Sequence, residues 1–541
     1  MAEIICNKNR GYKWMNEKGI YFKGYLQTEN GEIWRAEQAI EQLYGIDSFE
    51  AFRKYLQNIY GVFAIIMEHG SETWLASDVA GSMPLYYTDD SKVIADDVDA
   101  IIKSGNGYEK LDSLRAFELY ATSYVGYSNT VYRHIKQIQI GSVCRVDNNS
   151  TVEIPYYVHA GRAFDRSEET AIQELHEKTQ AMMKRVIAAV EGRPVVISLS
   201  GGYDSRYVAC SLKDNGVDNV ICYTYGREGS FEVEQSRKVA NALGYKWYNV
   251  QYNDSEIKAL IHEDGYFDYS NRPDYITYLQ NYHAVKKLKE MEKLPENAVF
   301  ITGLCNDMPT GFYIPDRKEV EQFGFSNEGA AEYNVQQRFV KFKITEEAER
   351  KYKDDILKFL REMGVSVTDY ESFVSALDCI ETSGFHTHCY LNMNTVHDYF
   401  GYEWILPCWD HDMLTYWYSL VPKLRIGQYL YEKYITEHIG RKYGVGTKKH
   451  LNLSAPTPFL DKMKRICGGI LVRITYPLGI PIRRNTDVNN FAMFEVELYK
   501  AISQKNAIKA DRAGIILLLT IFIMERRYGK NWYRNIKKYL K

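Results

Sequence analysis

The sequence lacks a hydrophobic run long enough to cross a membrane. Its longest apolar run covers residues 513–524, which is 12 residues, against the roughly 20 that a spanning helix needs. The first residues also lack the charged-then-apolar pattern of a signal peptide. These absences predict a soluble protein in the cytoplasm, and they predict a buried helix at residues 513–524.

The sequence also lacks paired cysteine motifs and any excess of basic residues. Its nine cysteines are scattered and form no Cys-x-x-Cys pair, which indicates free thiols rather than disulfides or a zinc site. The formal net charge is −3, so the chain has no surplus of positive charge with which to neutralise nucleic-acid phosphates. We therefore expect no nucleic-acid partner and no membrane partner.

Two secondary-structure patterns divide the chain. Residues 1–160 contain short apolar runs separated by turn residues, such as 19–26, which predict a mostly β domain. A polar stretch at 160–166 then leads into alternating strands and helices, the pattern of a doubly wound parallel sheet. Beyond residue 316 or so the chain is mainly helical. The length of 541 residues exceeds one core, and we expect two domains, 1–160 and 161–541.

A glycine-rich string follows the first strand predicted in the second domain, at residues 193–199, and opens a predicted helix at 203–214. It reads Ser200-Gly201-Gly202-Tyr203-Asp204-Ser205. Glycines let the backbone approach a ligand, and the N-terminus of a helix attracts an anion. The two serines add hydroxyl donors, and Asp204 suits a magnesium ion that bridges to phosphate. The string lacks the Gly-Lys-Ser/Thr of a Walker loop. It predicts a pyrophosphate-binding loop, and a turn without a ligand is the weaker alternative.

The loop resembles the signature of the ATP pyrophosphatases, which cleave ATP between the α and β phosphates and transfer AMP. Four further segments, in the right order, resemble the asparagine synthetase family within that group. They are 78–87 (Asp-Val-Ala-Gly-Ser-Met-Pro-Leu-Tyr-Tyr), 302–307 (Thr-Gly-Leu-Cys-Asn-Asp), 403–410 (Glu-Trp-Ile-Leu-Pro-Cys-Trp-Asp) and Lys448-Lys449. The resemblance covers most of the chain, and the loop is its most specific motif.

The resemblance implies a fold and a set of partners. The N-terminal α+β domain would be an Ntn-hydrolase-like β-sandwich. An α/β ATP-pyrophosphatase domain would follow, with a doubly wound parallel sheet and a helical C-terminal part. ATP and Mg²⁺ are the expected cofactors, and a small-molecule carboxylate with ammonia or an amine donor the expected substrates.

The resemblance also implies a role for each matched residue. Leu199 and Gly303 would contact adenosine through their backbones, and Asp204 and Asp307 would bind Mg²⁺. Either Lys448 or Lys449 would stabilise the adenylated carboxylate. The pyrophosphate would be held by Ser200, Gly201, Gly202, Asp204 and Ser205. Glu232 falls near an acidic position of the family, although a carboxylate at a helix N-terminus explains it equally well.

The N-terminal domain departs from the family at its nucleophile. The family's glutaminase needs a cysteine directly after Met1, and this sequence has Ala2 there. The Arg-Gly-Pro-Asp segment that grips glutamine is missing, and Lys23-Gly24 stands where the family strand has Asn-Gly. The Asn30-Gly31 pair is better explained as a hairpin turn. We expect a domain that keeps the fold and has lost glutamine hydrolysis.

The synthetase domain departs at Leu304, where the family has a glutamate that helps to deprotonate the attacking amine. Leucine transfers no proton. Three residues could supply a carboxylate instead, and the sequence does not choose among them: Glu381, Asp398 and Glu403. His386 and His388 form a His-x-His pair without a third ligand nearby, so polar packing is the preferred interpretation.

These features predict an ATP-dependent ligase that adenylates a carboxylate, releases pyrophosphate and forms an amide bond with ammonia or an amine. Two variants stay open: amidation of a sugar acid in polysaccharide synthesis, and ring closure as in β-lactam and lasso-peptide cyclases. A catalytically degenerate ATP-binding protein is the alternative of another class, and Asp204 in an intact loop argues against it. A homodimer is among the possible assemblies.

Overall fold

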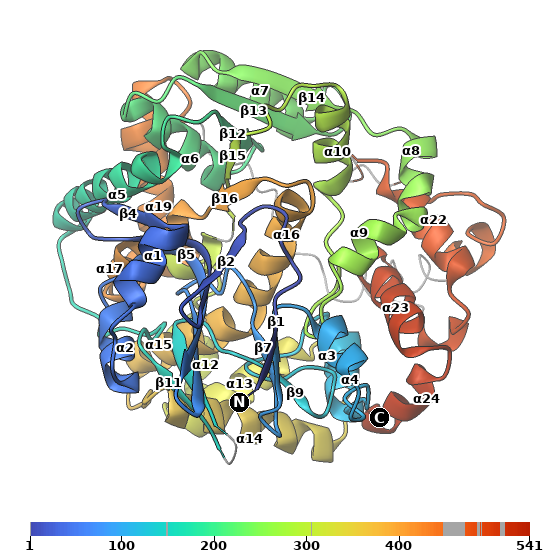
Figure 1. The fold of residues 1–541 in the computed structure, drawn as a ribbon. Coiled ribbons are helices and arrows are strands. Elements are labelled where there is room, and N and C mark those ends of the chain that lie inside the picture. Colours follow the sequence, from blue (N-terminus) through green and yellow to red (C-terminus); the bar gives the residue numbers. More distant parts are fainter. Residues whose placement is uncertain are drawn as a thin grey trace.

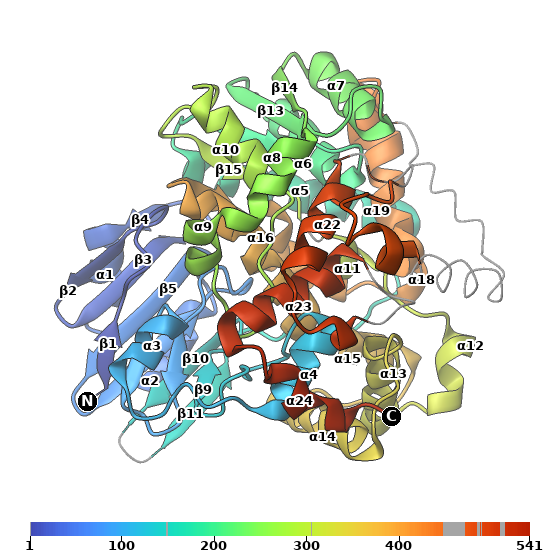
Figure 2. The same ribbon diagram turned by 90° about the vertical axis from the view of Figure 1, so that its right-hand side faces the viewer.

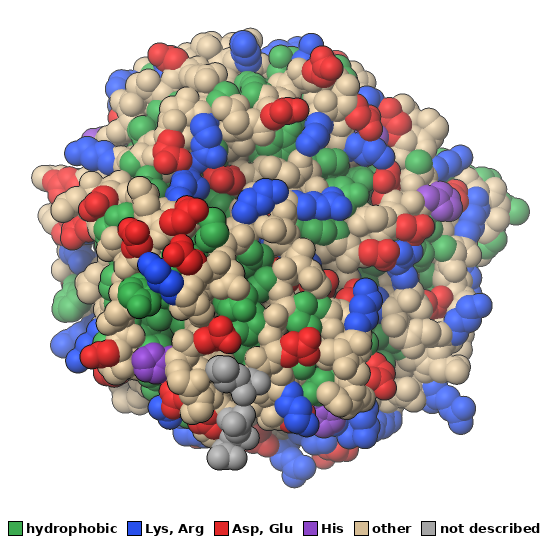
Figure 3. All heavy atoms as spheres, in the orientation of Figure 1, with side chains coloured by type: hydrophobic (Ala, Val, Ile, Leu, Met, Phe, Trp, Pro, Cys, Tyr) green, Lys and Arg blue, Asp and Glu red, His purple; other side chains and the backbone are tan. Residues whose placement is uncertain are grey.

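The structure is a computed structural model that describes residues 2–147, 150–304, 306–446, 471–483, 487, 489–508 and 514–541. Strands near the N-terminus form one part of the molecule, and a parallel sheet with its helices forms another (Figure 1). Helices near the C-terminus lie along both parts (Figure 2). On the face in Figure 3 acidic and basic side chains are intermixed, in keeping with the small net charge.

The larger N-terminal sheet has the strand order β11-β10-β6-β5-β3-β2, with β4 beside β3. Neighbouring strands run antiparallel. Strand β5 is buried over residues 62–67 without alternation, as expected when both faces of a sheet are covered. The bounds are β2 Trp14–Glu17, β3 Ile20–Gln27, β4 Ile33–Arg35, β5 Tyr60–His69, β6 Glu72–Ser77, β10 Ser142–Val146 and β11 Thr151–Pro155.

A smaller sheet has the order β1-β8-β7-β9, in which β1 runs parallel to β8. Its strands are β1 Glu3–Ile5, β7 Tyr86–Thr88, β8 Val93–Ala95 and β9 Ile135–Gln137. Helices α1 (Ala36–Leu43) and α2 (Phe49–Leu56) pack against the larger sheet. Helices α3 (Val98–Ser104) and α4 (Ser113–Thr122) complete this part of the chain. The two sheets and four helices give the expected α+β character.

The second part contains a five-stranded sheet with the order β14-β13-β12-β15-β16, and every neighbouring pair is parallel. The strands are β12 Val195–Ser198, β13 Val220–Tyr225, β14 Lys246–Val250, β15 Val299–Ile301 and β16 Glu403–Ile405. The predicted strands correspond to β12, β13 and β15, whereas β14 and β16 were not predicted. The chain order reverses between β12 and β15. Such a switch point opens a crevice at the carboxyl ends of the strands.

Helices precede and connect these strands. Helix α5 (Glu168–Val190) begins where predicted, and the Oγ of Ser167 accepts a hydrogen bond from the N–H of Thr170 over 3.1 Å. Helix α6 (Tyr203–Asp214) follows β12, and α7 (Phe231–Leu243) follows β13. The other helices before β16 are α8 Asp254–Ala259, η1 Leu260–His262, α9 Asp264–Tyr269, α10 Tyr282–Glu290, α11 Asp307–Thr310, α12 Arg317–Val320, η2 Glu321–Phe323, α13 Asn327–Arg338, α14 Glu346–Glu362, α15 Tyr370–Glu381, η3 Thr382–His386 and α16 Thr387–Tyr399.

The C-terminal part is helical, as expected. Most of the apolar run predicted to form a buried helix lies in α23 (Ile515–Tyr528), which packs against α4 and against α22 (Phe491–Ala501). Among the described residues, no helix combines the length and the apolar character that crossing a membrane requires. The helices are η4 Pro407–Trp409, α17 His411–Tyr418, α18 Pro422–Arg425, η5 Ile426–Gln428, α19 Tyr429–Lys433, η6 Tyr434–Ile439, α20 Gly440–Lys442, α22 Phe491–Ala501, η7 Lys505–Ala507, α23 Ile515–Tyr528, α24 Trp532–Ile536 and η8 Lys537–Tyr539.

Candidate active site

The glycine-rich string forms the turn between β12 and α6. The backbone N–H of Ser200 donates to Oγ of Ser205 over 3.0 Å, and the N–H of Gly202 donates to Oγ of Ser200 over 3.1 Å. Gly202 is the N-cap of α6 and brings no side chain to cap the helix. The first N–H groups of α6 are therefore suited to an anionic ligand.

Two glycines let neighbouring segments approach this turn. A Cβ on Gly303 would lie 2.6 Å from the carbonyl oxygen of Asp204, and a Cβ on Gly201 would lie 3.2 Å from Cα of Glu232. Gly303 follows β15, and Glu232 lies at the start of α7 with its side chain exposed. Leu199 is buried, and its N–H donates to the carbonyl of Tyr223 over 2.8 Å. The structure thus brings the predicted residues from three strand ends together.

Buried oxygen atoms gather beside the turn. The hydroxyl of Tyr431 donates to Oδ1 of Asp204 over 2.9 Å. Within the part of the chain that the structure describes, three buried oxygens have no hydrogen-bond partner: Asp307 Oδ1, Asn306 Oδ1 and Thr302 Oγ1. Buried polar atoms are almost always paired, so these oxygens are available to bind a cation or a water molecule. A set of oxygen ligands that includes carboxylates suits Mg²⁺.

Arg206 binds the backbone of the turn, and no local sequence motif points to this residue. Its guanidinium is almost fully buried and donates to the carbonyl of Gly201 over 3.1 Å and to the carbonyl of Val445 over 3.1 Å. Burial lowers the pKa of Arg206. Lys448 and Lys449 follow Val445 shortly in the sequence but lie outside the described residues. Arg206 therefore ties the loop to the chain that leads toward them.

The three candidate carboxylates have different surroundings. Glu403 forms ion pairs with Arg35 at 3.2 Å and with Arg193 at 2.8 Å. Asp398 accepts hydrogen bonds from the N–H of Gly11 and the hydroxyl of Tyr269. Both carboxylates therefore bind groups of the N-terminal part, Glu403 through Arg35 and Asp398 through Gly11.

Glu381 is the candidate that lines a cavity together with Met308, which follows Asp307 in α11. The structure therefore favours Glu381 among the three. The nearby histidines are packed among polar groups, as preferred from the sequence. Nδ1 of His388 contacts the carboxylate of Asp274, and Nδ1 of His386 lies 3.3 Å from the carbonyl oxygen of Glu381.

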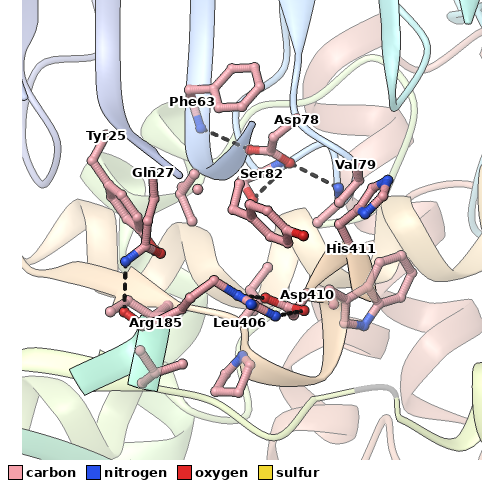
Figure 4. A pocket seen from close by; sticks show the side chains of 18 of the residues that line it. Tyr25, Gln27, Phe63, Asp78, Val79, Ser82, Arg185, Leu406, Asp410 and His411 are labelled. Carbon is pink, nitrogen blue, oxygen red and sulfur yellow. Dashed lines mark hydrogen bonds and ion pairs between the residues drawn. The ribbon is translucent and has the colours of Figure 1, made fainter. Parts of the chain in front are cut away.

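Two of the family-like segments meet at the boundary between the two parts (Figure 4). Asp78 accepts hydrogen bonds from the N–H groups of Phe63, Ala80 and Ser82 at 2.9–3.1 Å. Across the cavity, Arg185 forms an ion pair with Asp410 at 2.7 Å. The cavity measures about 50 Å³, far below the roughly 300–1,000 Å³ of small-molecule sites. These segments therefore join the two parts rather than line a nucleotide site.

Around Lys23, which stands where the family strand has Asn, the polar groups of the N-terminal part are hydrogen-bonded to one another. Nζ of Lys23 donates to the carbonyl of Lys8 over 2.6 Å. The carboxylate of Asp96 accepts from the N–H of Asn7 at 2.8 Å, the N–H of Lys8 at 2.9 Å and Nε1 of Trp14 at 2.7 Å. Burial, followed by the charge of Asp96, raises the pKa of the Cys6 thiol to about 12. Cys6 is therefore a thiol at neutral pH and a poor nucleophile.

Comparison with known families gives two matches in chain order. Residues 28–157 match the model of a glutamine amidotransferase domain, and residues 179–443 match the model of asparagine synthase. A probable asparagine synthetase (glutamine-hydrolyzing) of Acanthamoeba polyphaga mimivirus is 24% identical over 268 residues. That match covers 45% of this chain and 44% of the viral protein, so the chain spans less than half the length of this curated relative.

Two solved structures share 11% sequence identity with the chain. One is the allosteric regulatory enzyme of purine biosynthesis, with 44% of this chain and 62% of that chain covered and a TM-score of 0.19. The other is glutamine phosphoribosylpyrophosphate amidotransferase from B. subtilis complexed with ADP and GMP, with 55% and 58% covered and a TM-score of 0.18. Similarities at these TM-scores support no conclusion.

Proposed function

Because this chain belongs to the asparagine synthetase family, we propose that it is an AMP-forming ligase that joins a carboxylate to nitrogen through an acyl adenylate. The observation that carries the proposal is the close approach of Gly303, after β15, to the Ser200–Ser205 turn, together with the buried Oδ1 of Asp307, which has no hydrogen-bond partner among the described residues. A turn without a ligand would leave that carboxylate oxygen without a partner, at a cost in folding free energy.

The residues of the turn have separate tasks in this proposal. The N–H groups at the start of α6 and the hydroxyls of Ser200 and Ser205 bind the pyrophosphate portion of ATP. Asp204 and Asp307 would hold Mg²⁺, which would offset phosphate charge when bound. A carboxylate oxygen of the substrate attacks the α-phosphorus, and the bond to pyrophosphate breaks. Lys448 or Lys449 stabilises the adenylate.

The amide bond forms in a second step. The nitrogen attacks the acyl carbon, the C–O bond to AMP breaks, and AMP leaves with the electron pair while the nitrogen loses a proton. The glutaminase of the family would supply ammonia, but we propose that this chain has lost it. Ala2 cannot act as the nucleophile, Cys6 remains a thiol, and Lys23 and Asp96 are bound to neighbouring groups.

Exchange of labelled pyrophosphate into ATP tests the ligase. The protein is incubated with ATP, Mg²⁺ and a panel of carboxylic acids, aspartate first. At least one acid is expected to promote exchange, and Asp204→Ala is expected to abolish it. Asp218→Ala is the matched control, since that aspartate is 76% exposed and pairs only with Lys213 among the ion pairs of the described residues. ATP binding without exchange for any acid would refute the ligase and favour a degenerate ATP-binding protein.

Glutamine hydrolysis needs its own assay. Release of glutamate from glutamine is followed with ATP and Mg²⁺ present, and none is expected above the background of the protein-free buffer. Robust glutamate release would overturn the proposed loss without affecting the ligase proposal.

A further inference from the structure

A second cavity lies beside the proposed ATP site, with a volume of about 300 Å³. It is next to that site because Met308 lines it and Asp307 precedes Met308 in the short helix α11. The walls are mainly aromatic and apolar, and they include Tyr124, Met308, Tyr313, Tyr333, Leu377 and Phe385. The volume is at the lower end of the roughly 300–1,000 Å³ of small-molecule sites. The cavity can therefore hold an organic group of modest size.

The N-terminal part helps to build this cavity. Tyr124 belongs to that part, and the guanidinium carbon of Arg338 lies 4.3 Å from the centroid of its ring. Arg338 in turn forms an ion pair with Glu118 of α4, and both side chains are buried. The N-terminal part thus supplies one wall of a pocket beside the proposed synthetase site.

The charged groups around the cavity are paired, with one exception. Arg338 is bound to Glu118, and Asp378 forms a two-pronged ion pair with Arg425 at 2.7 and 2.8 Å. Glu381 accepts a hydrogen bond from the neutral amide of Asn334. Among the described residues Glu381 has no ion-pair partner within 4.0 Å. The pocket therefore combines apolar walls with one carboxylate that lacks a bound cation.

The helix that carries Glu381 is irregular at this point. Helix α15 ends at Glu381, a π-helical turn covers Thr382–His386, and α16 continues from Thr387. Such turns are rare and recur at functional sites. Nε2 of His386, in the same turn, is buried without a hydrogen-bond partner among the described residues, and the ring of His386 packs against Tyr313 of the cavity wall. An unpaired buried donor or acceptor beside the cavity is a second sign that a ligand belongs there.

We propose that this pocket binds the nucleophile of the reaction, and that the nucleophile is a primary amine on an apolar or aromatic group, held through its ammonium by Glu381. The assignment rests on the proposed ligase activity and names its amine substrate. Ammonia would leave most of the pocket empty, since a molecule of its size takes only about 30 Å³. Aromatic rings around a cation add attraction through their faces.

The chemistry balances with this assignment. The bound ammonium gives one proton to the carboxylate of Glu381, and the resulting free amine attacks the acyl carbon of the adenylate. A C–N bond forms, the C–O bond to AMP breaks, and the second proton leaves for the solvent. Glu381 thereby takes the task that Leu304 cannot perform. The carboxylic acid and the amine lie on one molecule if the enzyme closes a ring, and on two if it does not.

Calorimetry on the full-length protein tests the pocket without turnover. The protein is held with Mg²⁺ and α,β-methylene-ATP, and the probes are 2-phenylethylamine, its uncharged analogue 2-phenylethanol, and ammonium chloride. We expect saturable binding of 2-phenylethylamine and weaker binding of the other two. Glu381→Gln should weaken the binding of 2-phenylethylamine at least tenfold and leave the binding of 2-phenylethanol unchanged. Glu371→Gln, an exposed site on the same helix, is the matched control.

A second variant covers the case in which Glu381→Gln does not fold. Tyr313 is 46% exposed, so Tyr313→Ala should fold and should weaken the amine and the alcohol alike. The pocket assignment is overturned if 2-phenylethylamine does not bind, or if it binds Glu381→Gln and the parent protein equally. Pyrophosphate exchange distinguishes the two proposals, because exchange without amine binding refutes only the pocket, whereas amine binding without exchange refutes only the ligase.

Discussion

The phenolic hydroxyl of Tyr431 donates a hydrogen bond to Oδ1 of Asp204, with 2.9 Å between the two oxygens. This contact joins helix α19 to the first turn of α6, across 227 positions of sequence. Tyr431 is almost fully buried. Its hydroxyl therefore orients the carboxylate of Asp204 in the first turn of α6.

Removing that hydroxyl should weaken the response to Mg²⁺. In Tyr431→Phe the carboxylate of Asp204 loses its orienting donor, worth about 1 kcal/mol, or roughly fivefold in affinity. A titration of pyrophosphate exchange with Mg²⁺ measures the change as a higher half-saturating concentration. Tyr429→Phe is the control, because Tyr429 is 46% exposed on the same helix. An unchanged Mg²⁺ dependence in Tyr431→Phe would contradict the assignment of Asp204.

Adding one methyl group at Gly303 should disturb the ATP site. A Cβ there would meet the carbonyl oxygen of Asp204 at 2.6 Å, so the first turn of α6 or the end of β15 must move. Overpacking of this kind costs about 1–3 kcal/mol. We expect Gly303→Ala to lose ATP binding in calorimetry. Gly265→Ala is the control, since its nearest atom within 4 Å is the terminal oxygen of Tyr399 at 3.2 Å. Equal ATP affinity in both variants would refute the close approach.

Breaking the ion pair between Arg425 and Asp378 should lower the stability of the protein strongly, and removing both charges should restore part of it. Both side chains are 2% exposed. Arg425→Met leaves a buried carboxylate unpaired and should lower the free energy of unfolding by about 3–5 kcal/mol. Adding Asp378→Asn removes the charge and should recover part of the loss. Urea denaturation of the single and double variants measures both changes, and a double variant as unstable as the sum of the singles would argue against the pair.

The buried carboxyl of Asp78 predicts a stability that falls as pH rises. Burial raises its pKa to about 6, although hydrogen bonds from Ser82, Phe63 and Ala80 oppose the shift. Between pH 4 and pH 6 the unfolded chain has released this proton and the folded protein keeps it. The folded state therefore loses about 3 kcal/mol relative to the unfolded state across this window. Residue 78 cannot titrate in Asp78→Asn. The free energy of unfolding of the parent protein minus that of this variant should therefore fall by about 3 kcal/mol between pH 4 and pH 6. Denaturation midpoints at pH 4, 5, 6 and 7 measure it, and a constant difference would contradict the prediction.

The secondary structure near the glycine-rich loop of the synthetase part could be predicted well from the sequence. A strand of Val and Ile, two glycines and a following helix are local features, and they predicted β12, the turn and α6 in the right places. The sequence pattern does not predict the smaller strands β14 and β16, because Lys246–Val250 and Glu403–Ile405 are short and only partly apolar. Their strand character comes from pairing in the sheet rather than from local propensity.

The choice among Glu381, Asp398 and Glu403 was beyond the sequence. Each is a carboxylate in a stretch of similar composition, and nothing local shows that Arg35 and Arg193 take up Glu403. The role of Arg206 was also beyond the sequence, because only its contacts with Gly201 and Val445 in the folded chain distinguish it from an ordinary helix residue.

The sequence by itself determined the chemistry that the loop of Ser200–Ser205 can support, because that chemistry depends on residue types adjacent along the chain. It also determined what is missing at Ala2 and Leu304. Only the tertiary structure decided which distant groups face one another: Tyr431 with Asp204, Glu118 with Arg338, and Glu381 with an aromatic pocket. The physical reason is that a charge is neutralised or left available by its neighbours in space, and folding selects those neighbours from any part of the chain.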